Sequence, residues 1–336
     1  MLTTTVAGRT WNFSHSIGRN AAAGNGFANP FAMAFDPDGS LYVLSRGTER
    51  IGQGVTLGEN KRISKITLDQ EFLGDFAKQE FIWPSGLAVD KDSNVYCSDE
   101  HENTVAIYDK DGQKAGQWGE AGSQEGQLNG PSGLVFDGEG NLLVVDSLNN
   151  RVQKFTRDGK PLASFGSAGS EEGQFDKPWG ITIDKDGDIY VADFGNDRVQ
   201  KFSPDGKFLL SFGEIEGQGG ELNHPSDVGV DSEGDVYVVD FGNNRVQIYE
   251  SDGGIITALY GDATEFSKWG QDVVDANLDV SKAYRRVNDL TAVGKFARPV
   301  SILVDDQDRI IVSETVRGRL QVYDKEKDYL DPQFNL

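Results

Sequence analysis

The sequence predicts an all-β protein, a six-bladed β-propeller built from four-stranded antiparallel blades. Two observations carry this prediction. Prolines recur every 47 residues through the middle of the chain, and an aspartate follows each proline 15 residues later. Each period also contains four short segments of alternating apolar and polar residues. A fixed period of this size indicates stacked copies of one unit, and four short antiparallel strands per copy are typical of a propeller blade. The residues that set the period are Pro84, Pro131, Pro178, Pro225, Asp99, Asp146, Asp193 and Asp240.

The period from 178 to 213 serves as the type unit. Its segments alternate in the way that half-buried strands do, and glycine-containing turns separate them. The segment from Asp184 to Asp188 resembles a calcium loop only faintly, because its glycine comes fourth rather than sixth. We therefore predict a hairpin turn there. The four expected strands cover residues 179–184, 189–193, 198–202 and 207–212.

Six blades are counted, and the last one lacks a clear fourth strand. Residues 11–17 near the N-terminus resemble the fourth strand of the type unit, and they too precede a Gly-rich stretch that ends in a proline. We expect this segment to form the outer strand of the last blade, which closes the ring and removes its exposed edges. The whole chain, 1–336, is then a single domain. The blades open at Pro30, Pro84, Pro131, Pro178, Pro225 and Pro299.

Composition narrows the function classes. The chain carries 32 basic and 54 acidic residues, a net charge of −22, which opposes binding to nucleic acid or to an anionic membrane. The single cysteine, Cys97, excludes an internal disulfide and stands in a column of buried valines, so we interpret it as a core residue. No stretch is long enough to span a membrane. The N-terminus has no signal-peptide pattern, so we expect a soluble protein that is cytoplasmic, or exported with its signal removed.

The three central periods share the motif Asp-x-x-Asn-x-Arg-Val-Gln at 146–153, 193–200 and 240–247. Together with the Pro-Ser-Gly-Leu opening at 131–134 and the Gly-x-Phe-x-x-Pro linker at 173–178, it resembles the NHL-repeat family of six-bladed propellers. The resemblance implies the fold and leaves the function open, because function depends on sites grafted onto a fold.

Two enzyme groups with similar propellers suggest possible metal sites. Peptide-amidating lyases hold zinc with histidines close after the blade-opening prolines. Here those positions hold Phe31, Ser85, Ser132, Trp179, Ser226 and Val300, so that zinc site does not transfer. Gluconolactonase-like propellers hold calcium or another divalent ion with carboxylates and amides around the axis. Glu314, and with it Glu100 or Asp227, is the corresponding candidate for calcium or zinc; no organic cofactor is expected.

Features that repeat in every blade are interpreted as scaffold. The aspartates of the motif and the arginines five residues later (Arg151, Arg198, Arg245) are expected to cap loops and pair with each other. Departures from the repeat are where a functional site is expected. Two insertions, 46–61 in the first blade and 262–297 in the last, fall on the face that carries the blade-opening loops and the loops between second and third strands.

The later insertion has helical spacing at Val273, Val280 and Val287, with Ala276 and residues 283–284 in phase. We predict an amphipathic helix. Since the first and last blades are neighbours in a closed ring, the two insertions are expected to form a lid over a central pocket. The alternative is that the loops grew only because they are tolerated there.

The non-repeating residues of this face supply the candidate site. An apolar wall is expected from five aromatic residues, and ionisable groups stand among them. An apolar pocket with a few converging polar groups is the usual form of a ligand site. The expected catalytic acids and bases are His224, His101, Glu100 and Asp227. The expected substrate-binding residues are Arg46, Arg298, Trp179, Phe31, Trp83, Phe194 and Phe241.

The sequence therefore predicts a propeller that binds a polar, carboxylate-bearing small molecule and transforms it as a lyase or hydrolase. His224 or His101 would act as acid or base, and Arg298 or Arg46 would hold the carboxylate. The alternative is a non-enzymatic scaffold for a protein partner, or a ligand sensor, that uses the same face.

Overall fold

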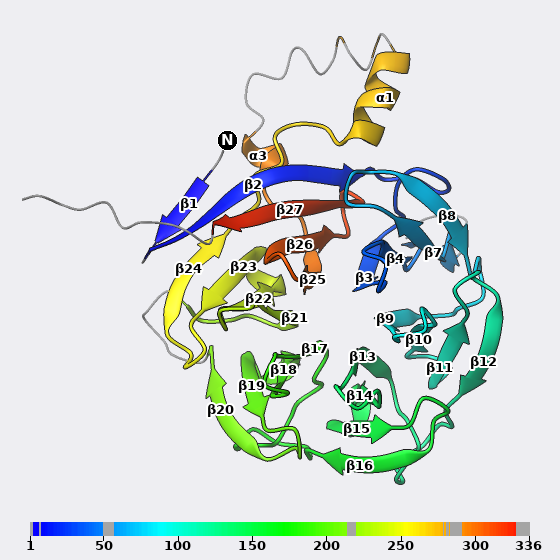
Figure 1. Ribbon diagram of the computed structural model, residues 1–336, viewed down its shortest axis with the longest axis vertical. Coiled ribbons are helices and arrows are strands. Elements are labelled where there is room, and N and C mark those ends of the chain that lie inside the picture. The colour runs from blue at the N-terminus through cyan, green and yellow to red at the C-terminus, as the bar shows by residue number, and fades with distance from the viewer. Residues whose placement is uncertain are drawn as a thin grey trace, which may run out of the picture.

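The computed structural model describes residues 3–6, 8–49, 57–213, 220–277, 279, 282 and 291–326. Six antiparallel sheets stand around a central axis, as Figure 1 shows, and the predicted six-bladed propeller is confirmed. Each blade runs from an inner strand at the axis to an outer strand at the rim. Five blades have four strands, and the last has five.

The strands of the blades, from inner to outer, have the following bounds. Blades 1 and 2 contain β3 (Pro30–Phe35), β4 (Leu41–Ser45), β7 (Arg62–Ile66), β8 (Phe72–Phe76), β9 (Pro84–Val89), β10 (Val95–Asp99), β11 (Thr104–Tyr108) and β12 (Lys114–Trp118). Blades 3 and 4 contain β13 (Pro131–Phe136), β14 (Leu142–Asp146), β15 (Arg151–Phe155), β16 (Pro161–Phe165), β17 (Ile181–Ile183), β18 (Ile189–Asp193), β19 (Arg198–Phe202) and β20 (Phe208–Phe212). Blades 5 and 6 contain β21 (Pro225–Val230), β22 (Val236–Asp240), β23 (Arg245–Tyr249), β24 (Ile255–Leu259), β25 (Pro299–Val304), β26 (Arg309–Glu314), β27 (Arg319–Glu326), β2 (Arg9–Gly18) and β1 (Thr3–Val6).

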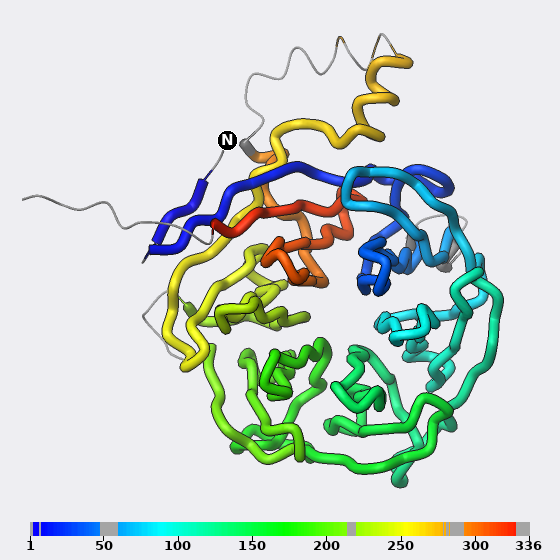
Figure 2. Tube along the Cα trace, in the orientation of Figure 1, coloured from blue at the N-terminus to red at the C-terminus, as the bar shows by residue number. Residues whose placement is uncertain are grey.

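The ring closes through the N-terminal segment, as predicted. Strand β2 pairs antiparallel with β27, from Thr10 opposite Glu326 to Gly18 opposite Arg319. Figure 2 shows the blue start of the chain lying beside its red end. The indole of Trp11 is buried and donates a hydrogen bond to the hydroxyl of Tyr237 in blade 5, at 2.9 Å. Strand β1, which the repeat did not predict, folds back on β2 as a further outer strand.

Alternation and turn chemistry explain the blades. The second strand of each of the first five blades is buried along its whole length, because it lies between two strands of its own sheet and two neighbouring blades. The turn after the first strand is an Asx-type hairpin: in blade 4 the carboxylate of Asp184 accepts the amides of Asp186 and Asp188. Gly187 adopts the positive φ that this turn requires. The predicted hairpin is confirmed.

The inner strands are held to one another by serine side chains. Ser85 donates to the carbonyl of Pro131, Ser132 to that of Trp179, and Ser226 to that of Val300, at 2.8–2.9 Å. Each bond joins one blade to the next across the wall of the axial channel. The serine that follows three of the opening prolines is therefore part of the scaffold.

The second insertion contains the predicted helix in part. Helix α1 (Lys268–Ala276) begins at Ser267, whose hydroxyl accepts the amide of Gly270, and α3 (Thr291–Gly294) ends the insertion. Val273 and Ala276 lie in α1, whereas Val280, Val287 and residues 283–284 lie outside the described residues.

Helix α1 does not cover the centre of the ring; it packs outside the rim (Figure 1), where Trp269 contacts Phe27 and Phe72. The expectation that this helix forms a lid is wrong. The buried side chain of Trp269 packs against aromatic residues at the rim, and the helix therefore lies away from the axis. The first insertion contributes a short hairpin of β5 (Thr48–Glu49) and β6 (Leu57–Glu59), and residues 50–56 are not described. In the part of the chain described here, no helix is long and apolar enough to cross a membrane.

Candidate functional site

The aspartate and arginine columns form the scaffold that the repeat predicts. In blade 4 the buried carboxylate of Asp193 accepts the amide of Asp176 in the incoming linker and the Nε of Arg198, at 2.8 Å each. Asn196 and Gln200 complete its shell at 2.9 and 3.1 Å. Burial raises the pKa of Asp193, because the cost of desolvation exceeds the effect of these donors. Blade 3 repeats this arrangement, and blade 5 repeats it except that Gln247 donates to the carbonyl of Thr257 rather than to Asp240.

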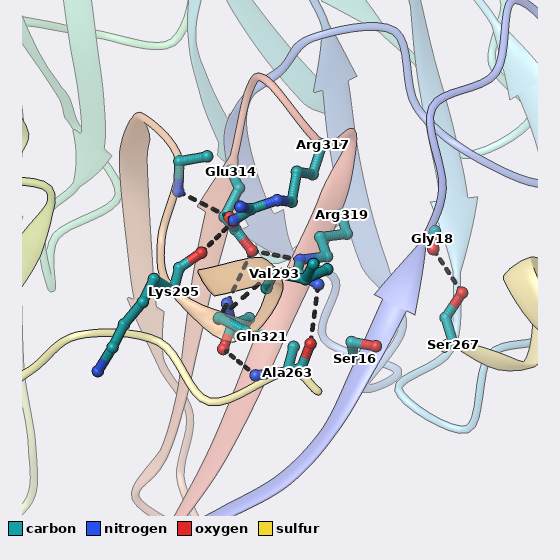
Figure 3. A network of polar contacts seen from close by, with 12 residues as sticks. Ser16, Gly18, Ala263, Ser267, Val293, Lys295, Glu314, Arg317, Arg319 and Gln321 are labelled. Carbon is teal, nitrogen blue, oxygen red and sulfur yellow. Dashed lines mark hydrogen bonds and ion pairs between the residues drawn. The ribbon is translucent and has the colours of Figure 1, made fainter. Parts of the chain in front are cut away.

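Blade 6 uses glutamate for the same purpose. The carboxylate of Glu314 is fully buried and accepts Ala297 N, Arg319 Nε and Gln321 Nε2 at 2.5–2.8 Å, as Figure 3 shows. Arg317 adds a second ion pair. The two arginines already neutralise this carboxylate, so its surroundings are those of a scaffold residue rather than of a metal ligand. Within the described ranges, no three His, Cys, Asp or Glu side chains are grouped so that they could hold a metal ion.

The same network fixes both ends of the second insertion. Arg319 donates to the carbonyls of Ala263, Val293 and Gly294, and Gln321 bridges the amide of Ala263 and the carbonyl of Gly294 (Figure 3). In blades 3 and 4 the arginine and glutamine bind a short linker, whereas in blade 6 the equivalent residues bind both ends of the long insertion.

The blade-opening loops and the loops between second and third strands lie on one face, which we call the linker face. Backbone hydrogen bonds join the two kinds of loop in all six blades: Arg46 N to Asn29 O, Glu100 N to Trp83 O, Leu148 N to Asn129 O, Gly195 N to Asp176 O, Gly242 N to Asn223 O and Thr315 N to Arg298 O. Non-repeating residues in either loop are thus brought to the same surface.

Four predicted aromatic residues meet in one continuous row on this face. The ring of Phe31 in blade 1 lies 5.7 Å from that of Trp179 in blade 4, although these blades stand opposite each other. Trp179 contacts Phe194 at 5.0 Å, and Phe194 contacts Phe241 at 6.5 Å, between ring centres. Because Phe31 and Trp179 meet across the axis, they form a plug at this end of the axial channel.

Arg46 continues the row toward blade 2. Its guanidinium lies 4.4 Å from the ring centre of Phe31 and 5.9 Å from that of Trp83, both within cation–π range. It also forms an ion pair with Glu100. Arg46 and Glu100, predicted separately as an anion clamp and a catalytic acid, therefore neutralise each other.

The two predicted histidines lie at opposite ends of the row. His101 packs edge-on against Trp83 at 5.7 Å, and its Nδ1 lies 3.1 Å from a Glu102 carboxylate oxygen. His224 packs against Phe194 at 4.7 Å, and its Nδ1 lies 2.6 Å from the amide oxygen of Asn223. About half of each imidazole is exposed. An acceptor at Nδ1 favours the tautomer with the proton on Nδ1, which leaves Nε2 with a free lone pair. The sequence reasoning missed Glu102 and Asn223, although each is adjacent in sequence to its histidine.

Asp227 and Arg298 stand apart from the row. The carboxylate of Asp227 lines the axial channel, a cavity of about 320 Å³ that Phe31 and Trp179 also line. It accepts the amides of Val228 and Ile302, and burial raises its pKa to about 6. Arg298 is exposed, and its side chain makes no hydrogen bond or ion pair with a described residue. Cys97 is fully buried, as predicted, and burial raises the pKa of its thiol.

The family model for the NHL repeat matches residues 128–155, 175–202 and 222–249, which are the blades that carry the repeated motif. The chain is an NHL-repeat propeller. No curated protein sequence matches this NHL-repeat propeller.

Solved structures match it over nearly its whole length. Streptogramin B lyase is 11% identical, with 94% of this chain and 98% of that chain covered and a TM-score of 0.57. A catalytically inactive virginiamycin B lyase from Staphylococcus aureus, solved with quinupristin, is 13% identical, with coverage of 94% and 99% and a TM-score of 0.57. A protein of unknown function from Bacteroides thetaiotaomicron is 18% identical, with coverage of 95% and 76% and a TM-score of 0.63. At such identities these likenesses establish the fold alone.

Proposed function

We propose that the linker face of this NHL-repeat propeller binds a small organic molecule and transforms it as a lyase or hydrolase. One observation carries the proposal: residues that depart from the repeat in four different blades form one contiguous row, with a histidine at each end. The propeller fold does not require aromatic side chains at these positions, because the same positions hold serine or glycine in other blades. An aromatic surface with a few polar groups fits an organic ligand.

The histidines supply the chemistry of the proposal. His224 and His101 each present Nε2 as a proton acceptor, since their Nδ1 atoms face acceptor oxygens. Such an imidazole can remove a proton from a substrate carbon or from an attacking water molecule. Removal of a carbon-bound proton starts an elimination, which is lyase chemistry, and the similar fold of two B-type streptogramin lyases supports that choice.

The charges of the face define the expected substrate. Arg46 is paired with Glu100, so it serves to hold the aromatic row. Arg298 is an exposed cation whose side chain makes no hydrogen bond or ion pair with a described residue, so it is a better candidate than Arg46 to hold a substrate carboxylate. Asp227 lies in the channel that adjoins the plug, where its raised pKa suits a proton donor.

Activity and binding assays test the proposal. Quinupristin and a panel of aromatic carboxylic acids are incubated with the protein, and products are followed by mass spectrometry and binding by tryptophan fluorescence. We expect His224→Ala or His101→Ala to lower turnover by 10²–10⁴-fold, the usual contribution of a general base. His15→Ala is the matched control, because His15 lies on outer strand β2 and bonds the carbonyl of Leu68. The assignment is wrong if His224→Ala, His101→Ala and Arg298→Ala all leave turnover and affinity unchanged.

A second candidate function is a docking surface for a protein partner. Trp83, Leu148 and Val316 belong to loops of the linker face and are 43%, 54% and 56% exposed, and apolar side chains gathered on one face can mark a docking site. In this case Leu148→Asp and Val316→Asp would abolish capture of the partner and leave small-molecule binding intact. Under the enzyme proposal there is no partner to capture, and both variants should leave ligand binding and turnover unchanged.

A further inference from the structure

Blade 2 keeps the scaffold aspartate and lacks its partners. Asp99 stands in the aspartate column, whereas Thr104 and Ala106 occupy the positions of the arginine and the glutamine. The arginine is present in the other five blades, as Arg62, Arg151, Arg198, Arg245 and Arg319. The linker into blade 2 is also short, running from Ala77 to Trp83 between β8 and β9.

The complete blades show what the missing arginine does. In blade 3 the Nε of Arg151 donates to Asp146 Oδ2 at 2.7 Å, and its Nη2 donates to the carbonyls of Gln124 and Gln127. In blade 5 the Nε of Arg245 lies 2.6 Å from Asp240 Oδ2. The aspartate of this column is thus a guanidinium acceptor that the fold has already oriented.

Asp99 keeps the linker contact of this column through Oδ2, and backbone amides take the place of the side-chain donors at Oδ1. Its carboxylate is 3% exposed and accepts four backbone amides: those of Ile82, Trp83, His101 and Glu102, at 2.7–3.1 Å. Over the described ranges, no lysine or arginine side chain pairs with it. Such a buried carboxylate is stabilised by its amide donors alone, and an approaching cation would gain a full ionic partner.

A cavity stands where the arginine and glutamine side chains lie in the other blades. It has a volume of about 250 Å³ and is lined by Asp99, Thr104 and Ala106 together with the carboxylates Glu80 and Glu102. Glu80 accepts the hydroxyl of Tyr108 at 3.0 Å, which holds its carboxylate at the wall.

Lysines near this cavity do not pair with Asp99. Lys114 lines the wall, but its ammonium group donates to Gln117 at 2.8 Å. Lys61 donates to the carbonyl of Phe81 at 3.1 Å. The cavity therefore combines a buried acceptor with two further carboxylates.

We propose that this cavity binds a guanidinium group, supplied by a free arginine-like molecule or by an arginine side chain of a peptide. The bound guanidinium would pair with Asp99 in the place that an intramolecular arginine occupies elsewhere in the ring. Glu80 and Glu102 would contact its remaining N–H groups. Two observations converge on this ligand: the empty arginine position with its cavity, and the guanidinium bound by the equivalent carboxylate in blades 3, 4 and 5. A planar guanidinium matches a carboxylate in a way that a lysine ammonium does not.

Calorimetric titration of the full chain tests the proposal with two probes. Agmatine represents a free guanidinium compound, and N-acetyl-arginine methylamide represents an arginine within a peptide. Cadaverine, a primary diamine, is the control for simple attraction to an acidic protein. We expect saturable binding of at least one guanidinium probe and at least tenfold weaker binding of cadaverine. The probe that binds more tightly identifies the source of the ligand.

Two variants locate the binding to this cavity. Thr104→Arg restores the residue found in the other blades and fills the cavity from within, so it should abolish binding and leave the protein folded. Thr104→Val is its matched control, because it keeps both the cavity and Asp99, and it should bind as the wild type does. Asp99→Asn should weaken binding about tenfold or more, the loss expected for one charge-assisted hydrogen bond.

The proposal is overturned by either of two results. One is the absence of saturable heat with both guanidinium probes on the wild type. The other is binding to Thr104→Arg that equals binding to Thr104→Val. Since Thr104→Arg adds a residue that the fold accommodates in every other blade, a folding failure of Asp99→Asn would not prevent a decision.

Discussion

Replacing Asp193 with alanine removes the centre of one complete blade motif. The carboxylate is fully buried and accepts one linker amide and three side-chain donors, at 2.8–3.1 Å. Its loss removes an ion-pair partner of Arg198, which is 4% exposed. Removal of one partner of a buried ion pair costs about 3–5 kcal/mol, so we expect the free energy of unfolding to fall by about that amount.

The opposite replacement should cost less. Arg198→Thr copies blade 2, where Asp99 stays buried with only amide donors around it. In blade 4 it would leave Asp193 with the Asp176 amide and two side-chain amides, and it would release the carbonyls of Glu171 and Gln174 to water. We expect a loss of about 1–3 kcal/mol, the usual effect of removing a hydrogen bond to a charged group.

Urea unfolding followed by circular dichroism and tryptophan fluorescence measures both changes. The double variant should lose less than the sum of the single losses, by about 1–3 kcal/mol, because the two side chains share one ion pair. The reasoning is refuted if Asp193→Ala costs less than Arg198→Thr, or if the two losses add without coupling.

Three further replacements test other parts of the molecule. The pKa of Asp227 is raised in the folded state from 3.8 to about 6, so its contribution to stability is fully present below pH 3.8 and is lost as pH rises through about 6. Asp227→Asn should therefore flatten the pH dependence of the melting temperature between pH 4 and 6 and raise stability at pH 7 by at most about 3 kcal/mol; an unchanged pH profile would contradict the assignment. Phe31→Ala opens the plug and exposes the indole of Trp179, so the emission that Trp179→Phe abolishes should shift to longer wavelength, and no shift would mean that the plug is already open to water. Trp269→Ala removes the anchor of α1, which also bonds the carbonyl of Gln70. Hydrogen exchange should accelerate in residues 268–276 alone, and an equal acceleration across the blades would show that the helix supports the whole ring.

The repeat made the fold predictable, because each period constrains the others. The column of aspartates and arginines located the scaffold, and the similarity of residues 11–17 to the outer strand of blade 4 located the closure. Strand β1 escaped prediction because no other blade has a fifth strand to compare it with.

The sequence predicted which face carries the candidate site, but it did not predict which side chains on that face contact one another. Aligned columns indicate which face a residue occupies, but they carry no information on the distance of its side chain from the axis. Phe31 and Trp179 come from opposite blades and meet because both side chains are long enough to reach the centre. The pairing of Arg46 with Glu100 likewise depends on the contact of blades 1 and 2 in space.

The insertion shows a different limit. Helical spacing predicted α1, but the surface on which a helix packs depends on apolar partners that are distant in sequence. Trp269 contacts Phe27 and Phe72, which stand 242 and 197 residues before it in the sequence. No local pattern identifies them.

The pairing of β2 with β27 has a consequence for how the chain is made. Residues 9–18 are synthesised long before their partner strand, which begins at Arg319, so β2 waits until blades 1 to 5 and strands β25 and β26 have been made. During that interval the edge of β2 that later pairs with β27 is open and can join a second molecule. A circular permutant that opens the chain after Gly18 and links the old termini would make the last blade contiguous. Such a permutant should refold with less concentration-dependent association than the natural order of blades.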